Sequence, residues 1–161
     1  MKAMVLNELC GLQENQAPLE LTELPDPIPS ANEILIRVSA CGVCHTELDE
    51  IEGRTHPPRL PIVLGHQVVG RIETTGSEAN TFRIGDRVGI AWIFSVCGTC
   101  KFCLAGNESL CPDFKAGGRD ANGGYSVYER SRRLCYPHSP LFNDSEAAPL
   151  LCAGAIGYRS L

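Results

Sequence analysis

Long hydrophobic segments are missing from this sequence. No apolar run approaches the about 20 residues that cross a bilayer, and the first residues, MKAMVLNE, do not lead into the apolar core and cleavage site of a secretory signal peptide. Basic residues are in the minority, since 14 lysines and arginines stand against 19 aspartates and glutamates and give a net charge of −5. That balance disfavours a surface that follows nucleic-acid phosphates. We therefore expect a cytoplasmic protein that binds neither membrane nor nucleic acid.

The glycine fingerprint of dinucleotide binding is also missing. That motif, Gly-x-Gly-x-x-Gly, lies between a strand and a helix. The glycine pairs at 117–118 and 123–124 lie in predicted loops instead, and the glycines at 65 and 70 enclose a histidine. We expect no nucleotide-binding fold within these residues.

Short strands dominate the predicted secondary structure, because 16 glycines and 11 prolines leave little room for long helices. A short acidic helix is predicted at 46–52, and we expect its Glu47, Glu50 and Glu52 on a solvated face. From Pro149 onward the sequence is apolar almost all round and predicts a second helix, of the kind that is usually buried. Alternating apolar residues predict strands at 1–6, 19–24, 33–40, 62–74, 85–92 and 125–129.

Cysteine, in contrast, is abundant. The nine cysteines are Cys10, Cys41, Cys44, Cys97, Cys100, Cys103, Cys111, Cys135 and Cys152. An odd number in a reducing compartment favours metal ligation over disulfides. We interpret Cys10, Cys41 and Cys135 as reduced thiols of the core or surface.

Four of the cysteines crowd into one short loop with the spacing Cys97-x2-Cys100-x2-Cys103-x7-Cys111. Four thiolates so close together are typical of a closed, tetrahedral structural zinc site. A bacterial iron–sulfur cluster motif would place its fourth cysteine after three residues, whereas the gap here is seven. This spacing therefore predicts a metal that folds a loop and performs no chemistry.

Cys44, His66 and Cys152 form a more scattered set of metal-ligating residue types. Cys44 follows a predicted strand, His66 lies between glycines, and Cys152 lies in the predicted terminal helix. Taken singly, each is also an ordinary core residue. Periodicity alone does not join them.

Six segments occur in the order found in zinc-dependent alcohol dehydrogenases of the medium-chain dehydrogenase/reductase superfamily. They are CGVCHTEL at 41–48, GH at 65–66, GDRVG at 85–89, the four-cysteine loop, GGY at 123–125 and APLLCAG at 148–154. The chain resembles the N-terminal, GroES-like catalytic domain of that family. The resemblance implies a mainly β fold, a partly open β-barrel with short helices and a zinc-binding loop lobe, with the nucleotide-binding Rossmann domain absent.

The same resemblance implies how the chain is divided. Residues 1–148 correspond to the GroES-like domain, with the structural zinc lobe at 93–115. Residues 149–161 correspond to the start of the helix that leads to the missing nucleotide-binding domain.

The resemblance also implies the roles of individual residues. Cys44, His66 and Cys152 would bind a catalytic zinc, a Cys2His set known for alcohol dehydrogenase, and the four clustered cysteines would bind a structural zinc. Thr46 would pass the alcohol proton onward, and Asp49 stands where many relatives continue this relay with a histidine. Gln67 stands where most relatives have an acidic residue. The implied substrates are small alcohols and aldehydes or ketones, with NAD or NADP as the hydride carrier.

Two further expectations concern the chain by itself. Without a nucleotide-binding domain it should lack dehydrogenase activity. We expect exposed apolar surface on its C-terminal helix at Leu150, Leu151, Ile156 and Leu161. The chain should therefore self-associate through this helix, or the helix should be displaced or disordered, and a displaced helix would keep Cys152 from the metal. The alternative function is a non-enzymatic, zinc-binding GroES-like interaction module. Two bound zinc ions per chain favour the enzyme domain, and one ion at the four-cysteine loop favours the module.

Overall fold

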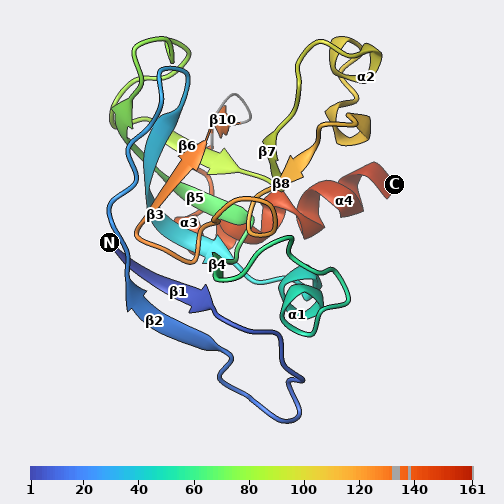
Figure 1. Ribbon diagram of the computed structural model, residues 1–161. Coiled ribbons are helices and arrows are strands. Elements are labelled where there is room, and N and C mark those ends of the chain that lie inside the picture. Colours follow the sequence, from blue (N-terminus) through green and yellow to red (C-terminus); the bar gives the residue numbers. More distant parts are fainter. Residues whose placement is uncertain (132–134, 138, 161) are drawn as a thin grey trace.

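The computed structural model describes residues 1–131, 135–137 and 139–160, and most of its regular structure is strand (Figure 1). The strands are β1 (Lys2–Leu6), β2 (Leu19–Glu23), β3 (Ile34–Gly42), β4 (Ile62–Val63), β5 (Gln67–Thr75), β6 (Arg87–Ile90), β7 (Ile93–Ser95), β8 (Lys115–Ala116), β9 (Tyr128–Ser131) and β10 (Cys135–Pro137). The helices are α1 (His45–Ile51), α2 (Lys101–Leu104), α3 (Asp144–Ala147) and α4 (Ala153–Ser160), with 3-10 turns η1 (Glu108–Leu110) and η2 (Ala148–Leu151).

Two antiparallel sheets form the body of the molecule. The larger sheet has the order β10-β6-β5-β3-β9, and the smaller has the order β2-β1-β4. Backbone bonds connect β1 to the segment before β9, from Met4 N to Tyr125 O at 2.7 Å and from Val127 N to Lys2 O at 3.1 Å. The sheets therefore curve into one partly open barrel (Figure 1), which confirms the predicted mainly β fold.

The main core lies on the inner face of the larger sheet. Alternation along β3, β5 and β6 turns β-branched side chains inward, because successive strand residues point to opposite faces. The buried members of this cluster are Ile34, Ile36, Val68, Ile72, Val88, Ile90 and Cys135. The strands that hold the candidate site are thus anchored by ordinary hydrophobic packing.

The C-terminal segment differs from the single helix predicted from Pro149. The structure has the 3-10 turn η2 followed by α4, and Cys152 between them leaves the helical region with φ −130° and ψ −79°. Ala147 and Ala148 are buried against Val69 of β5, so packing on the sheet sets the course of the chain here. Leu161 lies outside the described residues. In the part of the chain that the structure describes, no helix has the length and apolar character needed to cross a bilayer.

Candidate functional site

Three side chains that are far apart in the sequence meet at one point. Cys44 lies at the N-terminus of α1, His66 lies directly before β5, and Cys152 lies at the break between η2 and α4. Their ligand atoms are all within 4.8 Å of one another, and Sγ of Cys44 is 3.6 Å from Nε2 of His66. The imidazole is buried, whereas both cysteines remain partly exposed. The structure therefore brings together the three residues that the resemblance assigns to one metal.

Local backbone features fix the first two of these residues. Cys44 is the N-cap of α1, and its Sγ accepts the N–H of Thr46 at 3.3 Å. Gly65 precedes His66 with φ +100°, and a Cβ there would lie only 2.7 Å from the ring of Tyr125. Only glycine combines this left-handed conformation with so close an approach. The tight turn at Gly65 thus fixes the backbone position from which the side chain of His66 extends.

The third residue is held through its neighbours in the chain. Arg87 of β6 donates to Oδ1 of Asp144 at 2.7 Å and to the carbonyl of Phe142 at 2.9 Å. This fastens α3 to the sheet, and η2 follows α3 directly. Cys152 therefore reaches the site from an anchored segment.

Glu47, which lies on α1, contacts two of the three candidate ligand residues. Its carboxylate is almost fully buried, with Oε1 2.7 Å from Nδ1 of His66. The other oxygen, Oε2, accepts the backbone N–H of Cys44 at 2.8 Å. An acceptor at Nδ1 places the ring proton there, which leaves the Nε2 lone pair free for a cation. Glu47 thereby sets both the tautomer and the orientation of the candidate ligand.

The expectation of a solvated acidic face on α1 was wrong for two of its three residues. Glu47 is 1% exposed and Glu50 is 0% exposed, because this side of the short helix packs onto the barrel. Only Glu52 remains partly exposed, bonded to Arg54 and to the N–H of Leu12. The signal that could have identified Glu47 is its place three residues after the N-cap, where a capping-box carboxylate turns back toward the start of the helix.

Glu50 has an unusual environment. Both of its carboxylate oxygens are buried without a hydrogen-bond partner among the described residues. Burial, followed by the nearby charge of Glu47, raises the pKa of Glu50 from 4.5 to about 8. The side chain is therefore mostly protonated and neutral at pH 7. A second carboxylate charge beside Glu47 is avoided in this way.

The donor set fits a zinc ion. Tetrahedral bonds of about 2.3 Å to sulfur and about 2.0 Å to nitrogen separate the two donors by about 3.5 Å, and the Cys44–His66 pair is close to this separation at 3.6 Å. Burial and then the charge of Cys44 raise the pKa of Cys152 to about 11. The raised pKa means that two thiolates side by side are energetically unfavourable without a counter-charge. A bound divalent cation would supply that charge and stabilise both thiolates. Three protein donors also leave one tetrahedral position for another ligand.

A cavity of about 290 Å³ opens beside these donors. It is lined by His66, Cys152 and the hydroxyl-bearing Thr46, and most of its other walls are apolar. Asp49, the second predicted relay residue, is not among the described residues that line it. Its carboxylate pairs instead with Arg54, and Nε2 of His45 lies 3.5 Å away.

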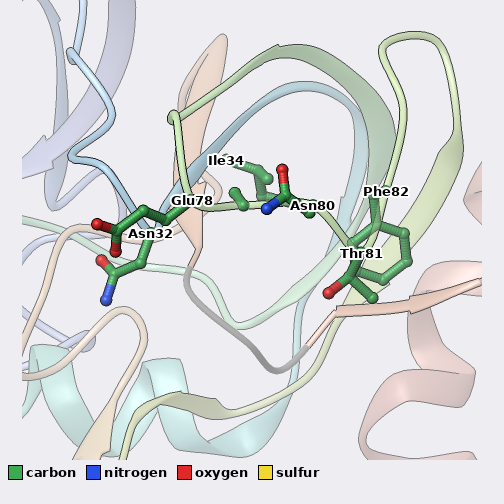
Figure 2. Close-up of a pocket in the computed structure, with 7 residues that line it drawn as sticks. Asn32, Ile34, Glu78, Asn80, Thr81 and Phe82 are labelled. Carbon is green, nitrogen blue, oxygen red and sulfur yellow. The ribbon is translucent and has the colours of Figure 1, made fainter.

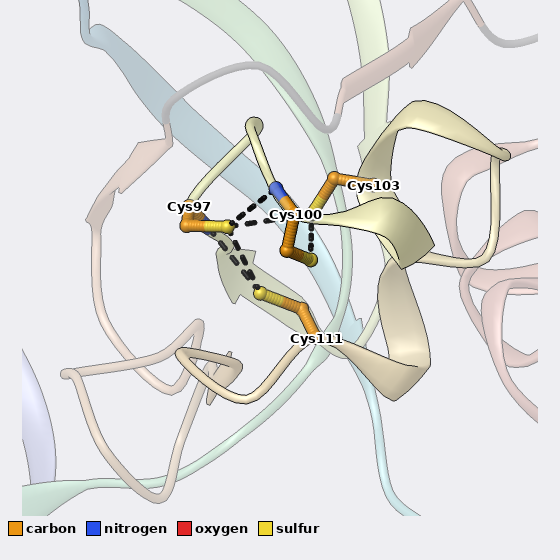
Figure 3. A group of neighbouring side chains, drawn as sticks. All are labelled: Cys97, Cys100, Cys103 and Cys111. Carbon is orange, nitrogen blue, oxygen red and sulfur yellow. Dashed lines mark hydrogen bonds between the residues drawn. The ribbon is translucent and has the colours of Figure 1, made fainter.

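The four-cysteine loop forms a lobe that projects from the barrel on the side of α4 (Figure 1). The sulfur of Cys97 lies 3.9 Å from that of Cys103 and 3.6 Å from that of Cys111, and the sulfurs of Cys100 and Cys103 are 3.6 Å apart (Figure 3). Tetrahedral zinc–sulfur bonds of about 2.3 Å give sulfur separations of about 3.8 Å. The four thiols are thus already spaced for one metal ion.

The backbone of the lobe favours ionised sulfur. The N–H groups of Thr99 and Cys100 point at Sγ of Cys97, at 3.5 and 3.3 Å, and lower the pKa of that thiol to about 6. A thiolate is the form that binds metal. A metal ion bound by four protein sulfurs would have no position left for a substrate, which is the arrangement of a structural site.

A second hollow, of about 380 Å³, lies between the turn at Asn32 and the loop from Glu78 to Phe82 (Figure 2). Neither group of candidate metal ligands contributes to its described lining. Its walls share no residue with the cavity beside His66. Of these two hollows, only the smaller one is lined by candidate metal ligands.

Comparison with known proteins gives the family. Residues 30–136 match the family model described as "Alcohol dehydrogenase GroES-like domain". The chain belongs to this alcohol dehydrogenase family. It is 45% identical over 150 residues to a probable alcohol dehydrogenase AdhA of Mycobacterium tuberculosis, covering 89% of this chain and 43% of that protein. It is 39% identical over 165 residues to an alcohol dehydrogenase of Geobacillus stearothermophilus, covering 100% and 47% respectively.

Solved structures agree with this alcohol dehydrogenase assignment. A cinnamyl alcohol dehydrogenase of Sorghum bicolor superposes with a TM-score of 0.86 at 27% identity, over 99% of this chain and 46% of that one. A crystal structure named as an NAD-dependent alcohol dehydrogenase superposes with a TM-score of 0.84 at 30% identity, over 94% and 43%. The GroES-like fold and the medium-chain dehydrogenase/reductase resemblance are thus confirmed. The alcohol dehydrogenase domain described here spans about half the length of the curated relatives it matches.

Proposed function

We propose that this chain is the substrate- and zinc-binding half of an NAD(P)-dependent alcohol dehydrogenase that interconverts alcohols with aldehydes or ketones. The observation that supports this most directly is the meeting of Cys44, His66 and Cys152 within 4.8 Å beside a cavity. A closed structural site would have no use for such a cavity. The family membership supports the same reaction class.

The chain's own residues would divide the work. Cys44, His66 and Cys152 hold the metal, and Glu47 keeps Nε2 of the imidazole unprotonated. A bound zinc ion supplies Lewis acidity to the alcohol oxygen, and a nicotinamide cofactor supplies the hydride acceptor. Thr46, which lines the cavity, would accept the alcohol proton on its hydroxyl and donate its own onward without adding a charge beside the site.

We propose Asp49 as the following group in this proton path. It lies one helical turn after Thr46, and His45 approaches it at 3.5 Å. Its carboxylate also pairs with Arg54.

Several further proposals concern the chain as a unit. Residues 1–148 form the GroES-like domain, and 149–161 begin the connection to a nucleotide-binding domain. Because these residues carry no dinucleotide fingerprint, we propose that they turn over no alcohol alone. Among the described residues, no two cysteines form a disulfide, which supports a reducing, cytoplasmic location.

Metal counting tests the proposed function. The purified chain, loaded with Zn²⁺ and freed of excess, should contain two zinc ions by elemental analysis. His66→Ala should retain one, because the four-cysteine lobe is separate. Cobalt-loaded chain should show a visible spectrum that shifts when an alcohol or imidazole is added, and His66→Ala should lack that shift. One zinc ion in the unaltered chain would favour the non-enzymatic module instead.

A further inference from the structure

The walls of the cavity beside His66 are uneven in polarity. Ala91, Trp92 and Ile93 follow β6 and supply one apolar part. Leu151 of η2 and Ile156 of α4 supply another. Carbon atoms of a bound alcohol would pack against these surfaces. A substrate with hydroxyls on every carbon would lose hydration there without compensation.

Besides Thr46, two hydroxyl-bearing side chains interrupt this apolar lining. Ser109 comes from η1 in the four-cysteine lobe, and Tyr136 comes from β10. Both side chains are exposed to solvent, Tyr136 to 49%. Neither hydroxyl forms a hydrogen bond with another described residue. Both are therefore available to a ligand, and each can donate or accept.

The lobe holds this part of the cavity in place. Ser109 precedes Cys111, one of the four clustered thiols, by two residues. Trp92 packs edge-to-face on Phe114, with ring centroids 5.0 Å apart, and its carbonyl accepts the N–H of Gly117 at 2.9 Å. The polar hydroxyl and the apolar indole thus share one rigid support. A binding surface needs such support to discriminate between ligands.

We infer that Ser109 and Tyr136 are specificity-determining residues that bind a second oxygen of the substrate, across an apolar stem from the reacting hydroxyl. This rests on the proposed function, which places the reacting hydroxyl at Cys44, His66 and Cys152. The cavity volume of about 290 Å³ is at the lower end of small-molecule sites. The substrate class is therefore a small alcohol with one ring or short chain and a distal hydroxyl or carbonyl.

Trp92 allows the proposed role of Ser109 and Tyr136 to be tested by a binding measurement that needs no hydride transfer. It is the single tryptophan of the chain and lines the cavity, so intrinsic fluorescence of the zinc-loaded chain reports occupancy. The probes are 4-(hydroxymethyl)benzyl alcohol and 4-methylbenzyl alcohol, which differ by one distal hydroxyl. The diol should bind about five- to ten-fold more tightly, the effect of one hydrogen bond. Ser109→Ala with Tyr136→Phe should abolish the preference and leave the affinity for 4-methylbenzyl alcohol within about two-fold.

Matched controls separate recognition from folding. Ser77→Ala and Tyr158→Phe remove the same hydroxyls from exposed positions outside the cavity and should keep the preference. All variants should keep two zinc ions. Equal binding of the two alcohols by the unaltered chain, or a preference that survives the double substitution, would overturn the assignment alone. No response to either alcohol would overturn the proposed function and this assignment with it.

Discussion

Oε1 of Glu47 lies 2.7 Å from Nδ1 of His66, and both atoms are buried with no other polar partner among the described residues. The contact comes from the helix that Cys44 begins, so one carboxylate links two of the three candidate ligands. A carboxylate behind a ligand histidine fixes the ring and makes it a stronger donor. This relationship explains why an acidic residue is buried in the first turn of this short helix.

Glu47→Ala should therefore weaken metal binding at this site by about 10- to 100-fold. A chelator competition with Zn²⁺ measures the two sites of the chain separately, and the four-cysteine lobe should keep its affinity. Glu8→Ala, an exposed carboxylate on the loop after β1, is the control and should change neither site. Unchanged affinity at both sites in Glu47→Ala would show that the contact does not support the metal.

Gly65→Ala should destabilise the protein more than Gly85→Ala, although both substitutions introduce a similar backbone strain. Gly65 and Gly85 have φ of +100° and +90°, but a Cβ at Gly85 meets nothing within 4 Å. Gly85→Ala should thus cost about 1 kcal/mol from strain alone, whereas Gly65→Ala adds a clash with Tyr125 and Cys41. Urea unfolding gives both values, and only Gly65→Ala should also lower zinc affinity at His66. Equal costs would mean that the close approach at Gly65 is easily relieved.

Glu50 should make stability depend on pH in an unusual direction. Its pKa is about 8 in the folded chain against 4.5 as the reference value, so the folded state binds more protons between these values. The free energy of unfolding should consequently fall as the pH rises from about 4.5 to about 8. Glu50→Gln, neutral at every pH, should reduce this fall and raise the melting temperature at pH 8 relative to the unaltered chain.

Glu52 provides the control on the same helix. The hydrogen bond from Arg54 is the main cause that lowers the pKa of Glu52, so its contribution is present above the reference pKa and is lost as the pH falls. Glu52→Gln should therefore leave the decline toward pH 8 in place. The test is to measure thermal melts of the zinc-loaded unaltered chain, Glu50→Gln and Glu52→Gln at pH 5.5, 7 and 8. A Glu50→Gln variant that declines as steeply as the unaltered chain would contradict the buried, neutral state of Glu50.

The sequence alone predicts the barrel better than the site. Alternating residues such as Ile34 and Ile36 identify strands, because burial of one face imposes a period of two. No local pattern joins Cys44, His66 and Cys152, since their meeting depends on how the sheet curves and on the break between η2 and α4. Only the resemblance to a family predicted it. The burial of Glu47 and Glu50 was missed because an acidic run in a short helix has the composition of a solvated surface.

The C-terminal helix carries the prediction of self-association. Leu150, Ile156 and Tyr158 are 41%, 64% and 82% exposed, and exposed apolar side chains favour association. We propose that two copies of the chain pair through α4, and sedimentation equilibrium should show a dimer at micromolar concentration. Tyr158→Asp introduces a charge outside the cavity lining and should shift the chain to monomer while retaining two zinc ions. Ile84 is 70% exposed and lies at the turn before β6, so Ile84→Asp should leave the dimer intact. A monomeric unaltered chain, or dissociation by Ile84→Asp alone, would show that α4 is not the surface through which copies associate.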